Sequence, residues 1–295
     1  MIWFSLAFGS ALLSAAAAVT QKKILFRLEA LDFSVLLSLV TLLLTLPLFA
    51  FIDYGTVSLA ALAVLLAKTL LGALAFLCVM LAIKNLEISG ALPMMVLTPG
   101  LVALTAFLIL GEALSGTELG GVLLLIVGTY VLEMRPGASL LAPFTVFTTS
   151  RKHHYIIAAL LLFTATAVAD RYLLTEMQLR PLPMLAFQNL FLALYFMLFA
   201  MVRRHTLQPV RAELRAQLRA QLPWVLLVAA CTLGYRFAHI EAVSLAPVAL
   251  VLSVKRLSVF FAAMFGGHLF REKYLPRKAV AIVVLLIGAT LVVGL

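Results

Sequence analysis

Long apolar runs follow one another along the chain, and short polar stretches separate most of them. A helix needs about 20 apolar residues to cross a hydrocarbon layer of roughly 30 Å. Most connections are only a few residues long, so we expect consecutive helices to run antiparallel. The pattern predicts ten membrane-spanning helices, at about residues 2–20, 33–52, 58–83, 89–110, 117–133, 154–175, 182–202, 222–244, 247–269 and 276–294.

The two halves of the chain repeat one another. The matched positions include Gln21-Lys22 with Asp170-Arg171 at an offset of 149, and Glu112 with Glu272 and Gly128 with Gly288 at an offset of 160. Each half holds five spans, and an odd number inverts the second copy relative to the membrane. We therefore expect an all-α membrane protein with two inverted five-helix repeats, at 1–134 and 153–295, joined by the loop 135–152. Inverted repeats are typical of secondary transporters, which bind substrate between the repeats.

Composition supports the membrane class. Hydrophobic residues make up 64% of the chain and charged residues only 12%. No stretch between spans is long enough for a soluble domain, and we find no nucleotide-binding loop, catalytic cluster or metal-ligand cluster. We therefore expect no enzymatic activity, no cofactor and no metal. The first span starts at Met1 without a basic leader, which indicates a retained helix rather than a signal peptide.

The net charge of +10 has a source other than nucleic-acid binding. Lys and Arg concentrate in the odd-numbered loops, while the even-numbered loops and their flanks hold only Arg171 and Arg180. This bias places the odd loops in the cytoplasm and both termini outside. We expect a multi-pass protein of a bacterial or archaeal cytoplasmic membrane, as a monomer or homodimer.

The longest polar stretch, Arg203–Gln221, joins the seventh and eighth spans. Arg211, Arg215 and Arg219 recur every fourth residue, which predicts a short helix with a basic face. Such a helix binds anionic headgroups of the inner leaflet. The alternative is a solvated connector helix that only obeys the topology rule.

Four basic side chains fall deep inside spans: Lys68, Arg236, Lys255 and Arg256. A charge at such a depth costs about 2.5–3.5 kcal/mol on insertion scales, so it lines a cavity or meets a partner. Counting along each helix places all four at a similar level, with Asp170 and Glu241 nearer the outer ends. Without acidic partners at that level, the four cations predict a site for an anionic group. The alternatives are snorkelling, pairing with helix-end carbonyls or with Glu241, and a role in proton coupling.

Two further features belong to this candidate site. An offset of 156 places Thr98-Pro99 on Val254-Lys255, so we expect Thr98 to offer a hydroxyl opposite the basic pair. A packing kink at Pro99 is the alternative. His239 and Glu241, near the outer end of the eighth span, form a candidate proton relay, unless they only face water at headgroup level.

Several motifs carry a family resemblance. The run 253–258 precedes Phe270-Arg271-Glu272 and Gly288 in the second half, and Gly111-Glu112 precedes Gly128 in the first. Together these resemble the drug/metabolite transporter superfamily, and most closely its ten-span, EamA-like members. In the related triose-phosphate and nucleotide-sugar transporters, a Lys-Arg pair in the ninth helix contacts substrate phosphate, and Lys255-Arg256 matches that pair. The resemblance also implies cytoplasmic termini, opposite to the orientation that the loop charges predict.

These observations predict a secondary transporter for a small anionic metabolite, phosphorylated or carboxylated, that works by alternating access around a central basic cavity. The alternatives are a translocase of a lipid-linked anionic headgroup and an exporter of amino acids or neutral metabolites. Export of lipophilic cations is disfavoured, because the first span lacks the acid that small multidrug exporters of the superfamily use. The expected partners are a small-molecule substrate and membrane lipids, with no nucleic acid.

Overall fold

The computed structural model describes residues 2–85, 98–133, 154–206 and 212–258, together with residues 261, 284, 287, 288 and 291. The helices in these ranges are α1 (Ile2–Leu25), α2 (Ala30–Thr45), η1 (Leu46–Phe51), η2 (Tyr54–Thr56), α3 (Leu59–Asn85), α5 (Thr98–Leu110), α6 (Gly116–Glu133), α8 (His154–Thr175), α9 (Pro181–Thr206), α10 (Ala212–Leu245) and α11 (Val248–Lys255). The predicted inter-repeat loop 135–152 lies outside the described residues. So does most of the predicted tenth span.

The described helices match the predicted membrane spans where the two can be compared. Six segments are long and apolar enough to cross a membrane: α1, α2 with η1, α3, α8, α9 and α10. The helices α5 and α6 are apolar but shorter, and α11 forms the start of the predicted ninth span. Pro47 lies at the start of η1, where its missing N–H favours the change from α-helix to the tighter 3₁₀ turn.

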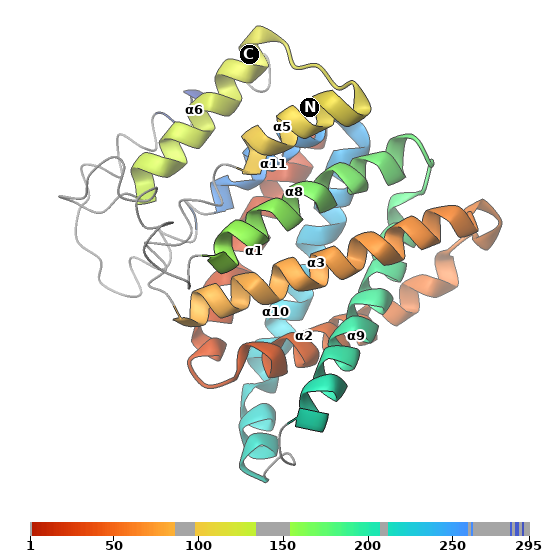
Figure 1. Ribbon diagram of the computed structural model, residues 1–295, viewed down its shortest axis with the longest axis vertical. Helices are drawn as coiled ribbons and strands as arrows, with labels where there is room; N and C mark the ends of the chain where they lie inside the picture. Colours follow the sequence, from red (N-terminus) through yellow and green to blue (C-terminus); the bar gives the residue numbers. More distant parts are fainter. Residues whose placement is uncertain are drawn as a thin grey trace.

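The helix α10 differs from the expectation. It runs for 34 residues from Ala212 through Pro223 without a break, which is about 51 Å at roughly 1.5 Å per residue. Its first turns extend beyond the rest of the bundle, at the bottom of Figure 1. The second part of Arg203–Gln221 is therefore not a separate short helix but the start of α10. A contact between this segment and lipid headgroups stays a prediction.

The helices of the two halves interlock into one bundle (Figure 1). The helix α3 of the first half packs along α8 of the second half, and α1 of the first half packs along α10 of the second half. The contact of α2 with α10 recurs as that of α9 with α3, and the contact of α1 with α11 recurs as that of α8 with α5. Each of these contacts has a counterpart when every helix is exchanged for the one five spans away. Neither half therefore forms a separate core.

Small residues let α1 approach α10 closely. Ser10 and Ala11 are fully buried, and Ser10 Oγ donates a hydrogen bond of 2.9 Å to the carbonyl oxygen of Tyr235. A Cβ atom added to Gly234 would lie 3.0 Å from Cδ1 of Leu13. Packing between close backbones is how helices associate in lipid, where hydrophobic burial provides little drive.

A second close approach lies at α6. A Cβ atom added to Gly288 would lie 2.9 Å from the backbone nitrogen of Leu125 and 3.1 Å from the carbonyl oxygen of Gly121. The neighbouring Gly120 has open space around it instead. Gly288 is thus the glycine that the contact with α6 requires.

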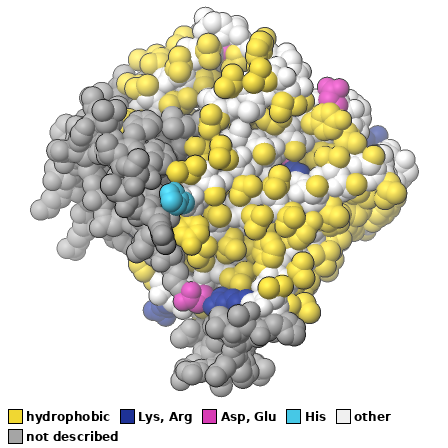
Figure 2. Space-filling view, in the orientation of Figure 1, with side chains coloured by type: hydrophobic (Ala, Val, Ile, Leu, Met, Phe, Trp, Pro, Cys, Tyr) yellow, Lys and Arg dark blue, Asp and Glu magenta, His cyan; other side chains and the backbone are white. Residues whose placement is uncertain are grey.

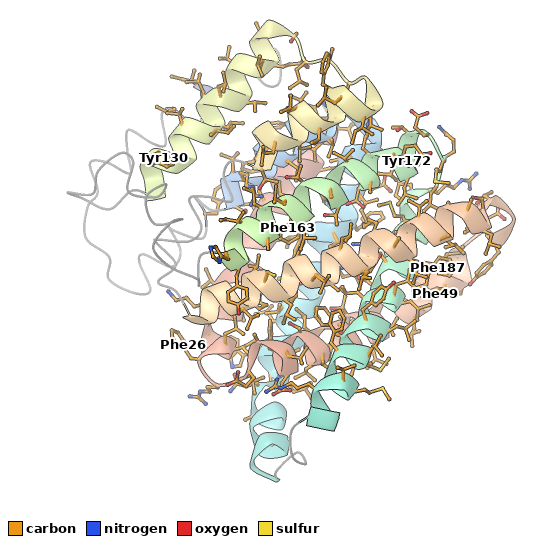
Figure 3. All side chains as sticks on the ribbon, in the orientation of Figure 1. Phe26, Phe49, Tyr130, Phe163, Tyr172 and Phe187 are labelled. Carbon is orange, nitrogen blue, oxygen red and sulfur yellow. The ribbon has the colours of Figure 1, made fainter. Side chains whose placement is uncertain are left out.

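The surface of the described residues suits a hydrocarbon environment. Most of the face shown in Figure 2 is hydrophobic, and charged side chains lie mainly near its edges. On α5, Phe107, Leu108 and Ile109 are each more than half exposed. Aromatic side chains also pack between the helices: the half-buried Phe49 of η1 meets the half-buried Phe187 of α9 edge to face, with ring centroids 5.4 Å apart (Figure 3).

Candidate functional site

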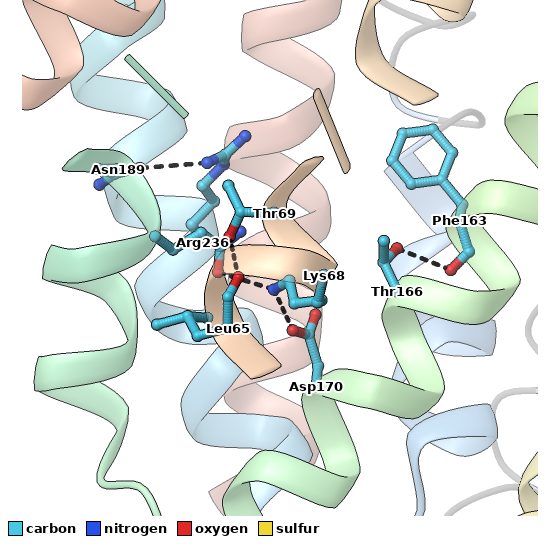
Figure 4. Close-up of polar contacts among 9 residues, drawn as sticks. Leu65, Lys68, Thr69, Phe163, Thr166, Asp170, Asn189 and Arg236 are labelled. Carbon is cyan, nitrogen blue, oxygen red and sulfur yellow. Dashed lines mark hydrogen bonds and ion pairs between the residues drawn. The ribbon is translucent and has the colours of Figure 1, made fainter. Parts of the chain in front are cut away.

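Lys68 lies within α3 and is almost fully buried, with 4% of its side chain exposed. Its Nζ forms an ion pair with the carboxylate of Asp170 on α8. The same Nζ donates a hydrogen bond of 3.0 Å to Oε1 of Gln188 on α9. The side chains of Lys68 and Asp170 point toward each other between the two helices (Figure 4).

The expectation that Lys68 has no acidic partner is therefore wrong. It came from counting depth along single helices, which placed Asp170 nearer the outer end of its span. Such counts ignore the tilt of each helix from the bilayer normal, which averages about 20°. They also ignore the length of the lysine side chain, which reaches past its own helical turn.

Arg236 on α10 lies among neutral partners. Its Nη1 donates a hydrogen bond of 3.1 Å to Oδ1 of Asn189 on α9 (Figure 4). The buried Asn189 donates in turn from Nδ2 to Oγ1 of Thr45 over 3.0 Å. Within the described ranges, Arg236 forms no ion pair. An amide orients this guanidinium but leaves its positive charge uncompensated.

The pair Lys255-Arg256 lies where α11 stops being a regular helix. The Nζ of Lys255 sits 5.1 Å from the ring centroid of Tyr235, within the range of a cation–π interaction. Arg256 donates from Nη2 to Oγ1 of Thr98, at the start of α5, over 2.7 Å. The structure therefore brings Thr98 to the basic pair, as the repeat comparison predicted. Substrate contact by these residues stays a prediction.

The helix α11 ends at this pair, although Arg256 keeps a helical backbone with φ −65° and ψ −16°. The regular turns of α11 end at Lys255, and Arg256 lies in a turn before Leu257 and Ser258 resume a helical conformation. The amide of Arg256 is shared between the carbonyl oxygens of Leu252 at 3.0 Å and Ser253 at 3.2 Å. Helix-end carbonyls carry partial negative charge and so favour cations at this position.

His239 is buried on α10, close to all four cations. The charges of Lys255, Lys68, Arg256 and Arg236 each act on its imidazole. Lys68 also interacts electrostatically with Arg236, and Lys255 with both arginines. The four basic side chains predicted to share one level are thus electrostatic neighbours, with a histidine among them.

The predicted proton relay of His239 and Glu241 is not assembled. In the described structure no hydrogen bond joins the two side chains, because positions two apart on a helix face different directions. Ser244 donates a hydrogen bond to the backbone carbonyl of Glu241. Nδ1 of His239 is buried and, as far as the described residues extend, has no hydrogen-bond partner.

A second polar group binds helix ends together. Nε of Arg171 on α8 contacts Oε1 of Glu112 at 2.5 Å. Nη1 of the same arginine donates to the carbonyl oxygens of Val243, at 2.6 Å, and Ser244, at 3.4 Å. Arg171 thus joins the segment after α5 to the last turn of α10, and Glu112 acts as a loop anchor.

Sequence reasoning missed three polar residues around the cations: Asp170 as a partner, Gln188 and Asn189. A signal was present. Gln188 and Asn189 are adjacent amides within an otherwise apolar span. Asp170 aligns with Gln21, which is also buried. Polar side chains at such positions in membrane spans face the bundle interior.

Comparison with known proteins gives the family. The model of the EamA-like transporter family matches residues 1–134 and 151–294. A crystal structure of a protein with 16% sequence identity aligns over 98% of this chain and 95% of that chain, with a TM-score of 0.69. At this identity the likeness shows a shared fold. No curated protein matches the sequence.

Proposed function

Because this chain belongs to the EamA-like transporter family, we propose that it is a secondary transporter that moves a small anionic metabolite across the membrane. Family membership gives a multi-pass membrane protein that transports small molecules. The anionic nature of the cargo is our proposal, and one observation carries it. Four basic side chains cluster in the bundle around His239, and among the described residues Lys68 forms an ion pair with Asp170.

The excess of positive charge favours an anionic ligand. Like charges in a medium of low dielectric constant repel strongly, and an anion among them relieves this repulsion. The planar guanidinium groups of Arg256 and Arg236 each match the oxygens of phosphate or carboxylate, while the ammonium group of Lys255 adds a compact charge. A phosphorylated or carboxylated metabolite is the substrate class with this chemistry.

The arrangement of helices supports transport by alternating access. The contacts of α2 with α10 and of α1 with α11 recur when each helix is exchanged for the one five spans away, which supports two inverted repeats that rock against each other. Thr98 and Lys255-Arg256 come from counterpart helices, so the site would lie where the repeats meet.

Uptake into proteoliposomes tests this function. We expect Lys255→Ala and Arg256→Ala each to reduce uptake of phosphorylated or carboxylated substrates at least tenfold, while the protein still inserts into the bilayer. Arg180→Ala is the matched control, because Arg180 is exposed at the start of α9. Equal uptake by the wild type and both cluster variants would refute the anion site.

Export of amino acids is a second candidate, favoured by Asp170. The carboxylate of Asp170 offers an acceptor for an ammonium group, while Lys255 and Arg256 offer donors for a carboxylate. Competition separates the two: under the main proposal acetate or phosphate inhibits uptake, whereas under this candidate only molecules that carry both an amine and a carboxylate inhibit it.

A further inference from the structure

The ion pair of Lys68 with Asp170 suggests how the basic cluster balances part of its own charge. We propose that Asp170 is a resident counter-ion. Its carboxylate pairs with Lys68 when the site is empty, and a substrate anion displaces it from Lys68. This inference rests on the proposed function, because it assigns a role to a residue of the same anion site. It makes Asp170 a determinant of anion affinity rather than a substrate ligand.

Geometry supports an exchangeable pair. Lys68 is more deeply buried than Asp170, with exposed fractions of 4% and 14%. Lys68 also keeps a second acceptor, Oε1 of Gln188, at 3.0 Å. An ammonium group has three donors, so Gln188 can hold the lysine in place while one carboxylate replaces another. Gln188 therefore makes the exchange compatible with a stable lysine position.

The position of Asp170 links this pair to the rest of the cluster. Its charge interacts with Lys255 as well as with Lys68, so it lowers the positive potential at two of the four cations. An incoming anion therefore meets a partly neutralised site and must compete with a carboxylate already present. Removal of the Asp170 charge should strengthen anion binding.

A purely structural ion pair predicts the opposite. Removing one partner of a buried pair leaves an uncompensated charge and is strongly destabilising. If the pair serves only the fold, Asp170→Asn lowers stability equally in all salts and gains nothing in affinity. If Asp170 is a counter-ion, added phosphate restores the lost stability, because phosphate takes the vacated place at Lys68.

The experiment is a thermal-unfolding titration of the purified full-length protein in detergent. Sodium phosphate is the probe, and sodium chloride of equal ionic strength is the reference. We expect Asp170→Asn to melt at a lower temperature than the wild type in chloride. We also expect its half-saturating phosphate concentration to fall about tenfold below that of the wild type. A concentration equal to or above that of the wild type would overturn the inference.

Glu112→Gln provides the matched control. Glu112 forms an ion pair with Arg171, which follows Asp170 on α8. The variant therefore loses a similar ion pair outside the basic cluster. Its half-saturating phosphate concentration should equal that of the wild type. A tenfold decrease in this control as well would show a general charge effect and overturn the role of Asp170.

A second variant tests the inference if Asp170→Asn does not fold. The double variant Lys68→Gln with Asp170→Asn removes both charges of this ion pair, so neither partner is left as a buried charge without the other. Under the counter-ion account the lost attraction and the lost competition offset each other, so the half-saturating concentration stays within about threefold of the wild type. A rise of tenfold or more would contradict the account.

Failure of the inference and failure of the proposed function give different results. If Lys255→Ala raises the half-saturating phosphate concentration and Asp170→Asn does not lower it, only the counter-ion role fails. If Lys255→Ala changes nothing, the anion site fails. If no variant, Asp170→Asn included, responds to phosphate, both are overturned.

Discussion

The Nη2 group of Arg256 donates a hydrogen bond of 2.7 Å to Oγ1 of Thr98. This bond joins the C-terminal end of α11 to the first turn of α5. The two helices also pack against each other. The predicted fourth and ninth spans contain these helices, so the contact runs between corresponding positions of the two halves. It fixes one arm of the guanidinium.

The variant Thr98→Val tests whether the hydroxyl of Thr98 orients Arg256. Valine keeps the shape of threonine but cannot accept a hydrogen bond, so Arg256 should lose its orientation. We expect the affinity for phosphate to fall about three- to tenfold, since a hydrogen bond to a charged group is worth roughly 1.5–3 kcal/mol and part of it can be replaced by water. Titration of the purified protein measures the change, and Thr98→Ser should bind as the wild type does. Equal affinity in Thr98→Val would show that the bond does not position Arg256.

The variant Asn189→Asp tests whether phosphate binding depends on a neutral partner of Arg236. Asn189→Asp replaces the amide with a carboxylate, which can still accept from Arg236. It loses the donor to Thr45 Oγ1, and the Thr45 hydroxyl would have to turn away from the carbonyl of Thr41 to donate to the new carboxylate. We expect the melting temperature to hold or rise. Phosphate affinity should fall about tenfold, because the new charge competes with the anion. Stronger phosphate binding by this variant would contradict a site built on unbalanced positive charge.

Gly288→Ala tests the contact with α6. The added Cβ atom would lie 2.9 Å from the backbone nitrogen of Leu125, so α6 or its partner must move. We expect a loss of about 1–3 kcal/mol, the usual range for overpacking, seen as a lower melting temperature. Gly120→Ala is the control, because nothing lies within 4 Å of its Cβ position. It should hold or gain stability, since alanine is the better helix former. Equal melting temperatures for Gly288→Ala and the wild type would refute the close approach.

Much of the fold follows from the length of apolar runs. The predicted span 154–175 coincides with α8. The repeat offset, which puts Thr98 on Val254, led us to expect its hydroxyl near the basic pair, and Thr98 Oγ1 accepts a hydrogen bond from Arg256. The start of α10 was not predicted, because the basic residues after Arg203 suggested a separate segment. The sequence AELRAQLRAQ from Ala212 is rich in strong helix formers, and propensity carries the helix through it.

The candidate site was less predictable for a geometric reason. Residue types identified the four cations, because charges within apolar spans are conspicuous. Partners depend on which helices face each other and at what tilt. The ion pair of Lys68 with Asp170 and the bond of Arg236 to Asn189 both cross between helices far apart in sequence. Span periodicity contains no such information.

Orientation in the membrane is open to a direct test. Loop charges predict that the segment 203–221 faces the cytoplasm. A cysteine introduced at Arg215, in a variant whose thiols at Cys78 and Cys231 have been replaced, should resist a membrane-impermeant maleimide added to intact cells. It should react after the cells are opened. Reaction in intact cells would reverse the assigned topology and place both termini inside, as the family resemblance implies.

The central claim is that the basic cluster binds an anion, and equilibrium binding of radiolabelled phosphate to the purified protein tests it most directly. The double variant Lys255→Met with Arg256→Gln removes two charged contacts at once. Each is worth roughly 1.5–3 kcal/mol, so together they should weaken binding at least about 100-fold. The account predicts saturable binding by the wild type and by Arg180→Ala, and none by the double variant at the same concentrations. Equal binding by all three proteins would contradict it.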